Sequence, residues 1–589
     1  MTSRSNPQAD NQACGASLPV LRPFDQVMRL SRMGSFFPHR LSFMRVLIRR
    51  LAAEKAVMQM PICQLDSDGF GHVVFSIPVS GRTYSLIAYS RYLEDDARTD
   101  RVIATQWDAS FCLFDGIPSP ADIDRLADEV TRQEAGRYDA RVLTLSRANK
   151  SLRLFQHVVE ALASGRQPDN ELLVATGYLM RTTAVYGNGK FGIADRDQVA
   201  GFAGMEGAFQ AEMLTVFLIR EFTLFLAEYC AQQRGGQKSV LLSDANRRYL
   251  GVGNSTGLGM APFLVTHPCL LNSWIMAREV AFARGLHYQN ATPAQVERAA
   301  RLLDRARLHC LEWQVEDAIQ MQRIYVLRDE LDRLSTDISY HPLDQKAPFA
   351  DLYHRAADGS QELQELLVSL IIELVPEEVD MLAECMATDA QPRLVPDMRI
   401  GEVKSLIATH YNWVEDIDFD QPEADAQFWY VSAAKLEPRL GLRHEEPGAE
   451  LEMPFNIARY IKELNSALAS TDDGELVAAF LLRAPEFRNI IRRVQTIAKF
   501  PYGEIYDNLV GQKCRAIDLL RCKLSFFGAS KFDPKSDKWT RITLYQGAPT
   551  AAEFETESPQ KLDDWLFPLH PTHLSGLQKG CLYDASLSK

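Results

Sequence analysis

The chain lacks any paired cysteine pattern. Its ten cysteines are scattered between Cys14 and Cys581, and none of them forms a C-x-x-C pair. A disulfide framework is typical of short secreted chains with cysteines at regular spacings. We therefore expect reduced thiols and a cytosolic protein.

Long apolar runs are also missing. The first 19 residues, "MTSRSNPQADNQACGASLP", are polar and lack the apolar core of a signal peptide. The most apolar stretch, "MLTVFLIREFTLFLAEYC", is interrupted by Arg220 and Glu221, which an uncharged membrane span would not contain. These features predict that a membrane is not a partner.

Positive charge is nowhere concentrated. The net charge is −13, and no block of five or six like charges occurs. Binding to a phosphate backbone needs a dense basic face, so we do not expect nucleic acid as a partner. A small anion needs only one local positive pocket and is not excluded.

The familiar catalytic motifs are absent as well. The chain has no H-E-x-x-H pair and no G-x-S-x-G elbow, and its glycine-rich region has no G-K-[ST] triplet. Zinc-protease chemistry, triad hydrolysis and a P-loop are therefore not predicted. We assign no metal and leave any cofactor unknown.

What is present is a long chain of ordinary globular composition, with 589 residues of which 46% are hydrophobic and 24% are charged. This length predicts about three or four domains, or one domain with large insertions. We expect an α+β, mainly α fold with a small N-terminal antiparallel sheet, a large helical middle region, an α+β C-terminal region and no strand–helix–strand units. The expected segments are a disordered tail (1–22), an α+β domain (23–165), a helical core domain (166–400) and a C-terminal α+β region (401–589).

Local patterns support these segments. Alternating runs at 71–79 and 82–90, separated by a short turn, predict a β-hairpin. Residues 205–230 are apolar on almost every side and predict a central buried helix. A capping box at 292–295 opens a helical pattern to about 335, which predicts a helix pair or an arm that could dimerise. Strand-like pieces return at 428–443 and 538–547.

The stretch "GVGNSTGLGMAPF" (251–263) is the most unusual feature. It is not a dinucleotide fingerprint, because Thr256 or Pro262 occupies the third glycine position. Bare amides of a glycine loop before a helix that begins at Pro268 nevertheless make a natural anion site. Asn254, Ser255 and Thr256 could add donors. The alternative is that the glycines only allow close packing.

A second stretch, "RTTAVYGNGKFGIADRD" (181–197), also combines glycines with donors. Its donor side chains are Arg181, Thr182, Thr183, Tyr186, Asn188 and Lys190. The Asn-Gly pair alone could mark a plain hairpin turn. Because the two stretches flank the same apolar helix, we expect them to form one anion site.

Candidate proton-transfer groups are His267, Tyr186, His410 and Tyr411. At the start of a helix, His267 would have a lowered pKa and a neutral imidazole suited to proton transfer. The alternatives are a buried histidine bonded to a backbone carbonyl and, for His410 and Tyr411, a solvated acidic loop at 410–420.

These features predict a cytosolic enzyme that acts on a small anionic metabolite, with lyase-type acid/base chemistry. The two glycine-rich stretches would bind the anion, and Arg181 or Lys190 would supply the positive charge. A homodimer formed through helices of 166–400 is expected. The alternative is a non-enzymatic helical scaffold or regulatory binding protein.

Overall fold

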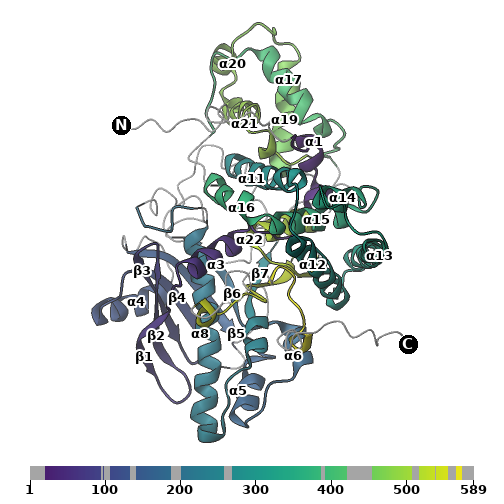
Figure 1. Ribbon diagram of the computed structural model, residues 1–589. Coiled ribbons are helices and arrows are strands. Elements are labelled where there is room, and N and C mark those ends of the chain that lie inside the picture. The colour runs from purple at the N-terminus through teal and green to yellow at the C-terminus, as the bar shows by residue number, and fades with distance from the viewer. Residues whose placement is uncertain are drawn as a thin grey trace.

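The computed structural model describes residues 20–94, 97, 106–132, 141–187, 201–207, 209–257, 268–386, 392–420, 454–506, 516–536, 539–554 and 565–573. They form a large mixed β-sheet with helices on its faces and a mainly helical half beside it (Figure 1). One hydrophobic core runs through both parts, from strand residues such as Phe75 to helix residues such as Leu367.

The sheet is much larger than the sequence predicted. Its strands are β1 (Gln59–Leu65), β2 (Gly71–Val79), β3 (Arg82–Ser90), β4 (Ala109–Asp115), β5 (Val142–Lys150), β6 (Tyr178–Gly187), β7 (Gly251–Gly257), β8 (Phe532–Ser536) and β9 (Trp539–Leu544). Their spatial order is β1-β2-β3-β4-β5-β6-β7-β9-β8. Among the described strands, β6 and β7 form the only parallel pair.

The expectation of a small antiparallel N-terminal sheet is therefore wrong. The predicted hairpin at 71–79 and 82–90 is confirmed as β2 and β3. The sheet continues into the expected helical region through β6 and β7, and into the C-terminal region through β8 and β9. The predicted strand at 538–547 is confirmed as β9. Glycine-rich strands have low intrinsic β propensity, and pairing between distant segments leaves no local pattern, so the sequence did not indicate that β6 and β7 are strands or that β9 joins this sheet. The predicted piece at 428–443 lies outside the described residues.

One long helix covers a face of the sheet. The predicted central helix is confirmed as α8 (Gln210–Gly235), which contacts β3, β4, β5, β6 and β7 and is buried along most of its length. The Phe222 ring packs edge-on against Phe111 of β4, with centroids 5.6 Å apart. On the other face, Ile123 and Leu126 of α4 (Pro120–Arg132) join a smaller apolar cluster.

Shorter helices lie in both halves. The N-terminal ones are α1 (Phe24–Val27), α2 (Leu30–Met33), α3 (Phe43–Ala53), α5 (Phe155–Ala163), α6 (Asn170–Thr176) and α9 (Asp244–Tyr249). Of these, α1 and α2 pack with the helical half (Figure 1). The helical half contains α11 (Pro268–His287), α12 (Pro293–Glu312), α13 (Ala318–Tyr340), α14 (Pro348–His354), α15 (Gln361–Leu374), α16 (Pro376–Val379), α17 (Ile400–His410), α19 (Pro454–Leu468), α20 (Val477–Arg483), α21 (Arg488–Ile497) and α22 (Ala516–Phe527). Short 3₁₀ turns include η5 (Asp380–Met386), η6 (Asn412–Val414) and η9 (Pro501–Gly503).

The predicted helix pair is confirmed. The capping box of Thr292 and Gln295 begins α12, which packs against α13 and α15. Buried residues such as Leu303 of α12 and Leu331 of α13 belong to the common core. The apolar face that motivated a homodimer is thus largely covered within one chain, and the homodimer stays a prediction.

Arg220 shows how one buried charge joins distant segments. Its guanidinium donates hydrogen bonds to the carbonyl oxygens of Leu250 (2.8 Å), Ala548 (2.8 Å) and Pro549 (2.9 Å). Its side chain is almost completely buried. Arg220 therefore fixes the chain before β7 to the chain after β9, and it breaks the apolar run for a structural reason.

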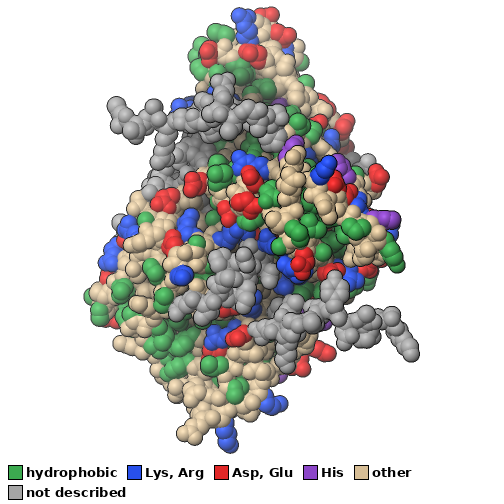
Figure 2. Space-filling view, in the orientation of Figure 1, with side chains coloured by type: hydrophobic (Ala, Val, Ile, Leu, Met, Phe, Trp, Pro, Cys, Tyr) green, Lys and Arg blue, Asp and Glu red, His purple; other side chains and the backbone are tan. Residues whose placement is uncertain are grey.

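The surface matches the mixed charge of the sequence. On the face shown in Figure 2, basic and acidic side chains are interspersed. Within the described ranges, the helices are too short or too polar for any of them to cross a membrane.

The glycines at the start of β7 are required by packing. A Cβ atom on Gly253 would lie 2.6 Å from the Tyr178 ring of β6, and one on Gly251 would lie 2.2 Å from the Leu544 carbonyl oxygen of β9. Both distances are shorter than a van der Waals contact. The packing alternative for these two glycines is therefore supported.

We expect Gly253→Ala to lower the free energy of unfolding by about 1–3 kcal/mol, because the added methyl group overpacks the site. Urea denaturation measures this change. Gly201→Ala is the control, since a Cβ atom there meets nothing within 4 Å. Equal stabilities of the two variants would show that the Tyr178 contact relaxes without cost.

Candidate functional site

The two glycine-rich stretches meet as neighbouring strands. Tyr178 of β6 is paired with Gly251 of β7, and Thr182 is paired with Asn254, in parallel register. Helix α8 connects the two strands, so β6, α8 and β7 form a strand–helix–strand unit. The expectation that the chain has no such unit is wrong.

Both strands end at the same edge, which we call the carboxyl edge; Gly187 and Gly257 are their last residues.

Three predicted binding residues lie on these strands, where Thr182 and Asn254 are register partners on one face and Arg181 is on the opposite face. Arg181 and Thr182 of β6 and Asn254 of β7 are all buried. The Asn254 Nδ2 group donates a hydrogen bond to Thr182 Oγ1 at 3.2 Å. The hydroxyl of Thr182 is also 3.4 Å from the Gly253 carbonyl oxygen. The structure thus joins residues that are 72 positions apart in the sequence.

The Asn254 carboxamide has one unused end. Its side chain is only 8% exposed, and in the described structure its Oδ1 atom has no hydrogen-bond partner. Oxygen and nitrogen of an amide are interchangeable in shape. Rotation of the amide by 180° would let Oδ1 accept from the Thr182 hydroxyl and would leave the NH₂ group as a free donor. A buried polar atom without a partner lowers the stability of the fold. In either orientation, the free end of the Asn254 amide is therefore a place for a polar ligand group.

The N-terminus of α8 lies at the carboxyl edge. Thr144 of β5 is paired with Gly187, the last residue of β6, and its hydroxyl is 2.6 Å from the Thr215 hydroxyl in the second turn of α8. The helix has no side-chain cap. The helix dipole adds positive potential to this edge, while the acidic side chain of Glu212 lies in the first turn.

Phe209 begins α8 in an unusual conformation. Its φ and ψ angles are 59° and 14°, in the left-handed region that bulky residues rarely occupy. The ring is held by Phe43 of α3 and Phe527 of α22, with centroid distances of 5.1 and 5.2 Å. Such strained residues are concentrated at functional sites. No sequence pattern indicated Phe209, Thr144 or Thr215, because only the strand register and the start of α8 bring them to this edge.

The remaining predicted residues of the site are described in part or not at all. Tyr186 lies in β6, and Ser255 and Thr256 lie in β7, where they are paired with β9. The other three, Asn188, Lys190 and His267, lie outside the described residues.

The predicted helix start at Pro268 is confirmed, but its first turn is covered. The Pro268 carbonyl oxygen packs against Gly503 of η9. The Tyr502 amide donates to Asn272 Oδ1 at 3.0 Å. Burial raises the pKa of the neighbouring Cys269 thiol to about 11, so the thiol stays protonated at neutral pH.

His410 and Tyr411 lie in a separate buried cluster in the helical half. Tyr411 donates from its hydroxyl to Glu504 Oε2 at 2.8 Å, and Arg493 binds both oxygens of Glu504 at 2.7 and 3.0 Å. His410 Nδ1 is 2.9 Å from the Tyr506 hydroxyl. The structure thereby joins residues 410–411 to the stretch 502–506.

The electrostatics of this cluster favour a structural role. Burial and the Glu504 charge raise the pKa of Tyr411 well above its usual value, so its hydroxyl remains a donor. Burial lowers the pKa of His410, against the opposing effect of Glu504. The Arg493–Glu504 pair is already neutral and fully bonded, and all five side chains are less than a tenth exposed.

The part of the chain that the structure describes contains no group of three or more His, Cys, Asp or Glu side chains placed to hold a metal ion. Comparisons with protein-family models, curated proteins and solved structures found no match. The functional argument therefore rests on the carboxyl edge of β6 and β7.

Proposed function

We propose that the protein binds a small anionic metabolite at the carboxyl edge of β6 and β7. The observation that carries this proposal is the parallel pairing of the two glycine-rich, donor-rich strands. In sheets with parallel strands, ligands bind outside the carboxyl ends of the strands, where the following loops and the helix N-terminus converge. The N-terminus of α8 lies at this edge.

The donor residues that the sequence predicts for this site suit an anion. Arg181 and Lys190 supply positive charge, one from the strand and one from the segment that follows it. The Asn254 amide and the hydroxyls of Thr182 and Ser255 supply neutral donors. Several converging donors in a water-poor site bind an anion more strongly than a single exposed charge does.

The chemistry we propose is proton transfer of the lyase type, in the cytosol. Tyr186 and His267 are the proposed proton-transfer groups, because each belongs to a stretch that begins or ends at the carboxyl edge. A neutral imidazole or a phenol can exchange a proton with a bound substrate near neutral pH. No cofactor or metal is part of this proposal.

Titration calorimetry with inorganic phosphate and with citrate as probes tests the anion site. We expect Lys190→Met and Ser255→Ala each to weaken binding by about 1.5–3 kcal/mol, the range for a hydrogen bond to a charged group. The melting temperature should stay nearly unchanged. Lys238→Met, at an exposed position beyond the other end of α8, is the matched control and should bind like the wild type.

Unchanged binding in both variants, or no binding of either probe by the wild type, would contradict the proposal. Turnover is tested separately by incubating the protein with a small-molecule cell extract and following metabolites by mass spectrometry. Loss of an anionic metabolite with the wild type but not with Lys190→Met supports an enzyme. Binding without turnover supports the alternative of a regulatory binding protein.

A further inference from the structure

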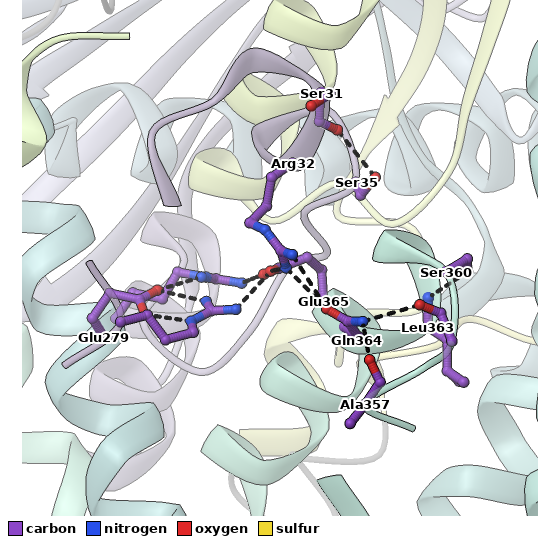
Figure 3. A network of polar contacts seen from close by, with 12 residues as sticks. Ser31, Arg32, Ser35, Glu279, Ala357, Ser360, Leu363, Gln364 and Glu365 are labelled. Carbon is purple, nitrogen blue, oxygen red and sulfur yellow. Dashed lines mark hydrogen bonds and ion pairs between the residues drawn. The ribbon is translucent and has the colours of Figure 1, made fainter. Parts of the chain in front are cut away.

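A buried group of charges in the helical half carries more positive than negative charge. Figure 3 shows part of this network, in which Arg32 of α2 and two further guanidinium groups surround Glu279 and Glu365. The three cations are Arg22, Arg32 and Arg278. Arg22 binds Glu279 at 2.8 Å and Glu365 at 2.8 Å. Three arginines thus share two carboxylates, which leaves one positive charge in excess.

A second group of arginines and carboxylates lies next to it. Arg45 of α3 lies 2.6 Å from Glu373 of α15, and Arg40 binds Asp380 through its Nη2 atom at 2.8 Å. Arg49 lies 3.6 Å from Asp380. Burial and the charge of Arg40 lower the pKa of Arg49 to about 9. Burial and the neighbouring guanidinium groups therefore disfavour the charged form of Arg49.

His39 lies between the two groups. Burial and the charges of Arg278, Arg45 and Arg49 lower the pKa of His39 well below its usual value, so the imidazole is neutral. Its Nδ1 atom accepts a hydrogen bond from the Leu41 amide at 3.2 Å, which places the proton on Nε2. This Nε2 donor is fully buried and has no partner in the described structure.

Arg278 has a second unused donor nearby. Its Nη groups bind Glu279 and Glu365, while its Nε atom, also fully buried, has no partner among the described residues. Trp274 and Arg278 are one turn apart on α11 and therefore share a face. The Trp274 ring packs on His39 at a centroid distance of 4.9 Å, and the Arg278 guanidinium lies 3.9 Å from the Phe36 ring centroid. These contacts place the Arg278 guanidinium beside the segment 36–39, and Arg278 is the nearby charge with the largest effect on His39.

We propose that a small monoatomic anion, chloride under cellular conditions, binds between His39 Nε2 and Arg278 Nε. The anion would accept hydrogen bonds from the two unused donors. It would also offset the excess positive charge of the group around Glu279 and Glu365, because a buried charge without a counter-charge destabilises the folded state. The Phe36 ring packs on the Arg278 guanidinium and the Trp274 ring packs on His39, and such apolar neighbours favour a weakly hydrated ion over a large polyatomic one. This site is independent of the carboxyl edge of β6 and β7.

Crystals grown in bromide test the site directly. We expect an anomalous bromide peak within hydrogen-bond distance of His39 Nε2 and Arg278 Nε. Absence of a peak there, at a bromide concentration of about 0.2 M, overturns the proposal, whatever peaks occur on the surface.

A solution measurement uses the intact protein. At constant ionic strength, replacing gluconate by chloride should raise the melting temperature of the wild type by about 1–3 °C, because the anion binds only the folded state. His39→Phe retains an aromatic ring against Trp274 but removes the donor, so its melting temperature should not respond. His309→Gln is the control: it changes another buried histidine outside the arginine groups, and it should retain the full response. An equal response of His39→Phe and the wild type overturns the proposal.

Discussion

Replacing Glu365 by glutamine should lower the free energy of unfolding by about 3–5 kcal/mol, the cost of breaking a buried ion pair by removing one partner. Burial alone would raise the pKa of Glu365, but the guanidinium groups of Arg22, Arg278 and Arg32 outweigh it and hold the pKa well below its usual value. The carboxylate is therefore ionised throughout the physiological range. Glutamine keeps the shape of the side chain but leaves three buried cations facing one remaining carboxylate, Glu279.

Urea denaturation of Glu365→Gln measures this loss. The matched control is Glu297→Gln, because Glu297 pairs with Arg301 on the exposed face of α12. Exposed pairs of this kind contribute less than about 1 kcal/mol. If the two variants lose equal stability, Glu365 does not hold Arg22 and Arg32 in place. The central role given to that carboxylate would then be wrong.

Acidification from pH 7 to pH 5 should lower the free energy of unfolding by about 4 kcal/mol through two buried histidines. Burial, together with neighbouring cations, lowers the pKa of both His39 and His309 well below the usual value. Both are neutral in the folded protein, whereas in the unfolded chain they take up protons below about pH 6.5. Their stabilising effect is thus present above that pH and is lost as the pH falls.

The check is a series of urea titrations in chloride-free buffer between pH 7 and pH 5. His39→Phe and His309→Gln should each remove about half of the pH dependence, although both also change stability at pH 7. His341→Gln changes an exposed histidine of the C-cap of α13 and should leave the dependence intact. A slope that persists in the double variant would assign it to other groups.

Local patterns predicted the elements whose side chains show regular periodicity. The hairpin of β2 and β3, the buried helix α8 and the capping box of α12 were all indicated by hydrophobic alternation or by cap residues. No local pattern indicated the size of the sheet. β7 contains three glycines and three small polar residues, a composition typical of a loop. It is a strand because its backbone pairs with β6 on one side and with β9 on the other.

The candidate site was predicted as a set of residues but not as an arrangement. The glycines and donors identified both stretches, yet no local pattern shows that β6 and β7 are parallel neighbours. The interpretation of Gly251 and Gly253 as bare anion-binding amides gives way to close packing. His410 and Tyr411 were chosen by residue type, and only the tertiary structure reveals that Glu504 and Arg493 are their partners.

The pairing of β7 with β9 has a consequence for synthesis on the ribosome. Gly257 is hydrogen-bonded to a strand that begins at Trp539, nearly 300 residues later in the chain. At translation rates of about 5–20 residues per second, β7 leaves the exit tunnel roughly 15–60 s before its partner exists. During that interval the nascent sheet has an open edge, the kind of surface on which unfinished chains aggregate or recruit chaperones. Completion of the sheet must therefore wait until the chain has been synthesised beyond Leu544.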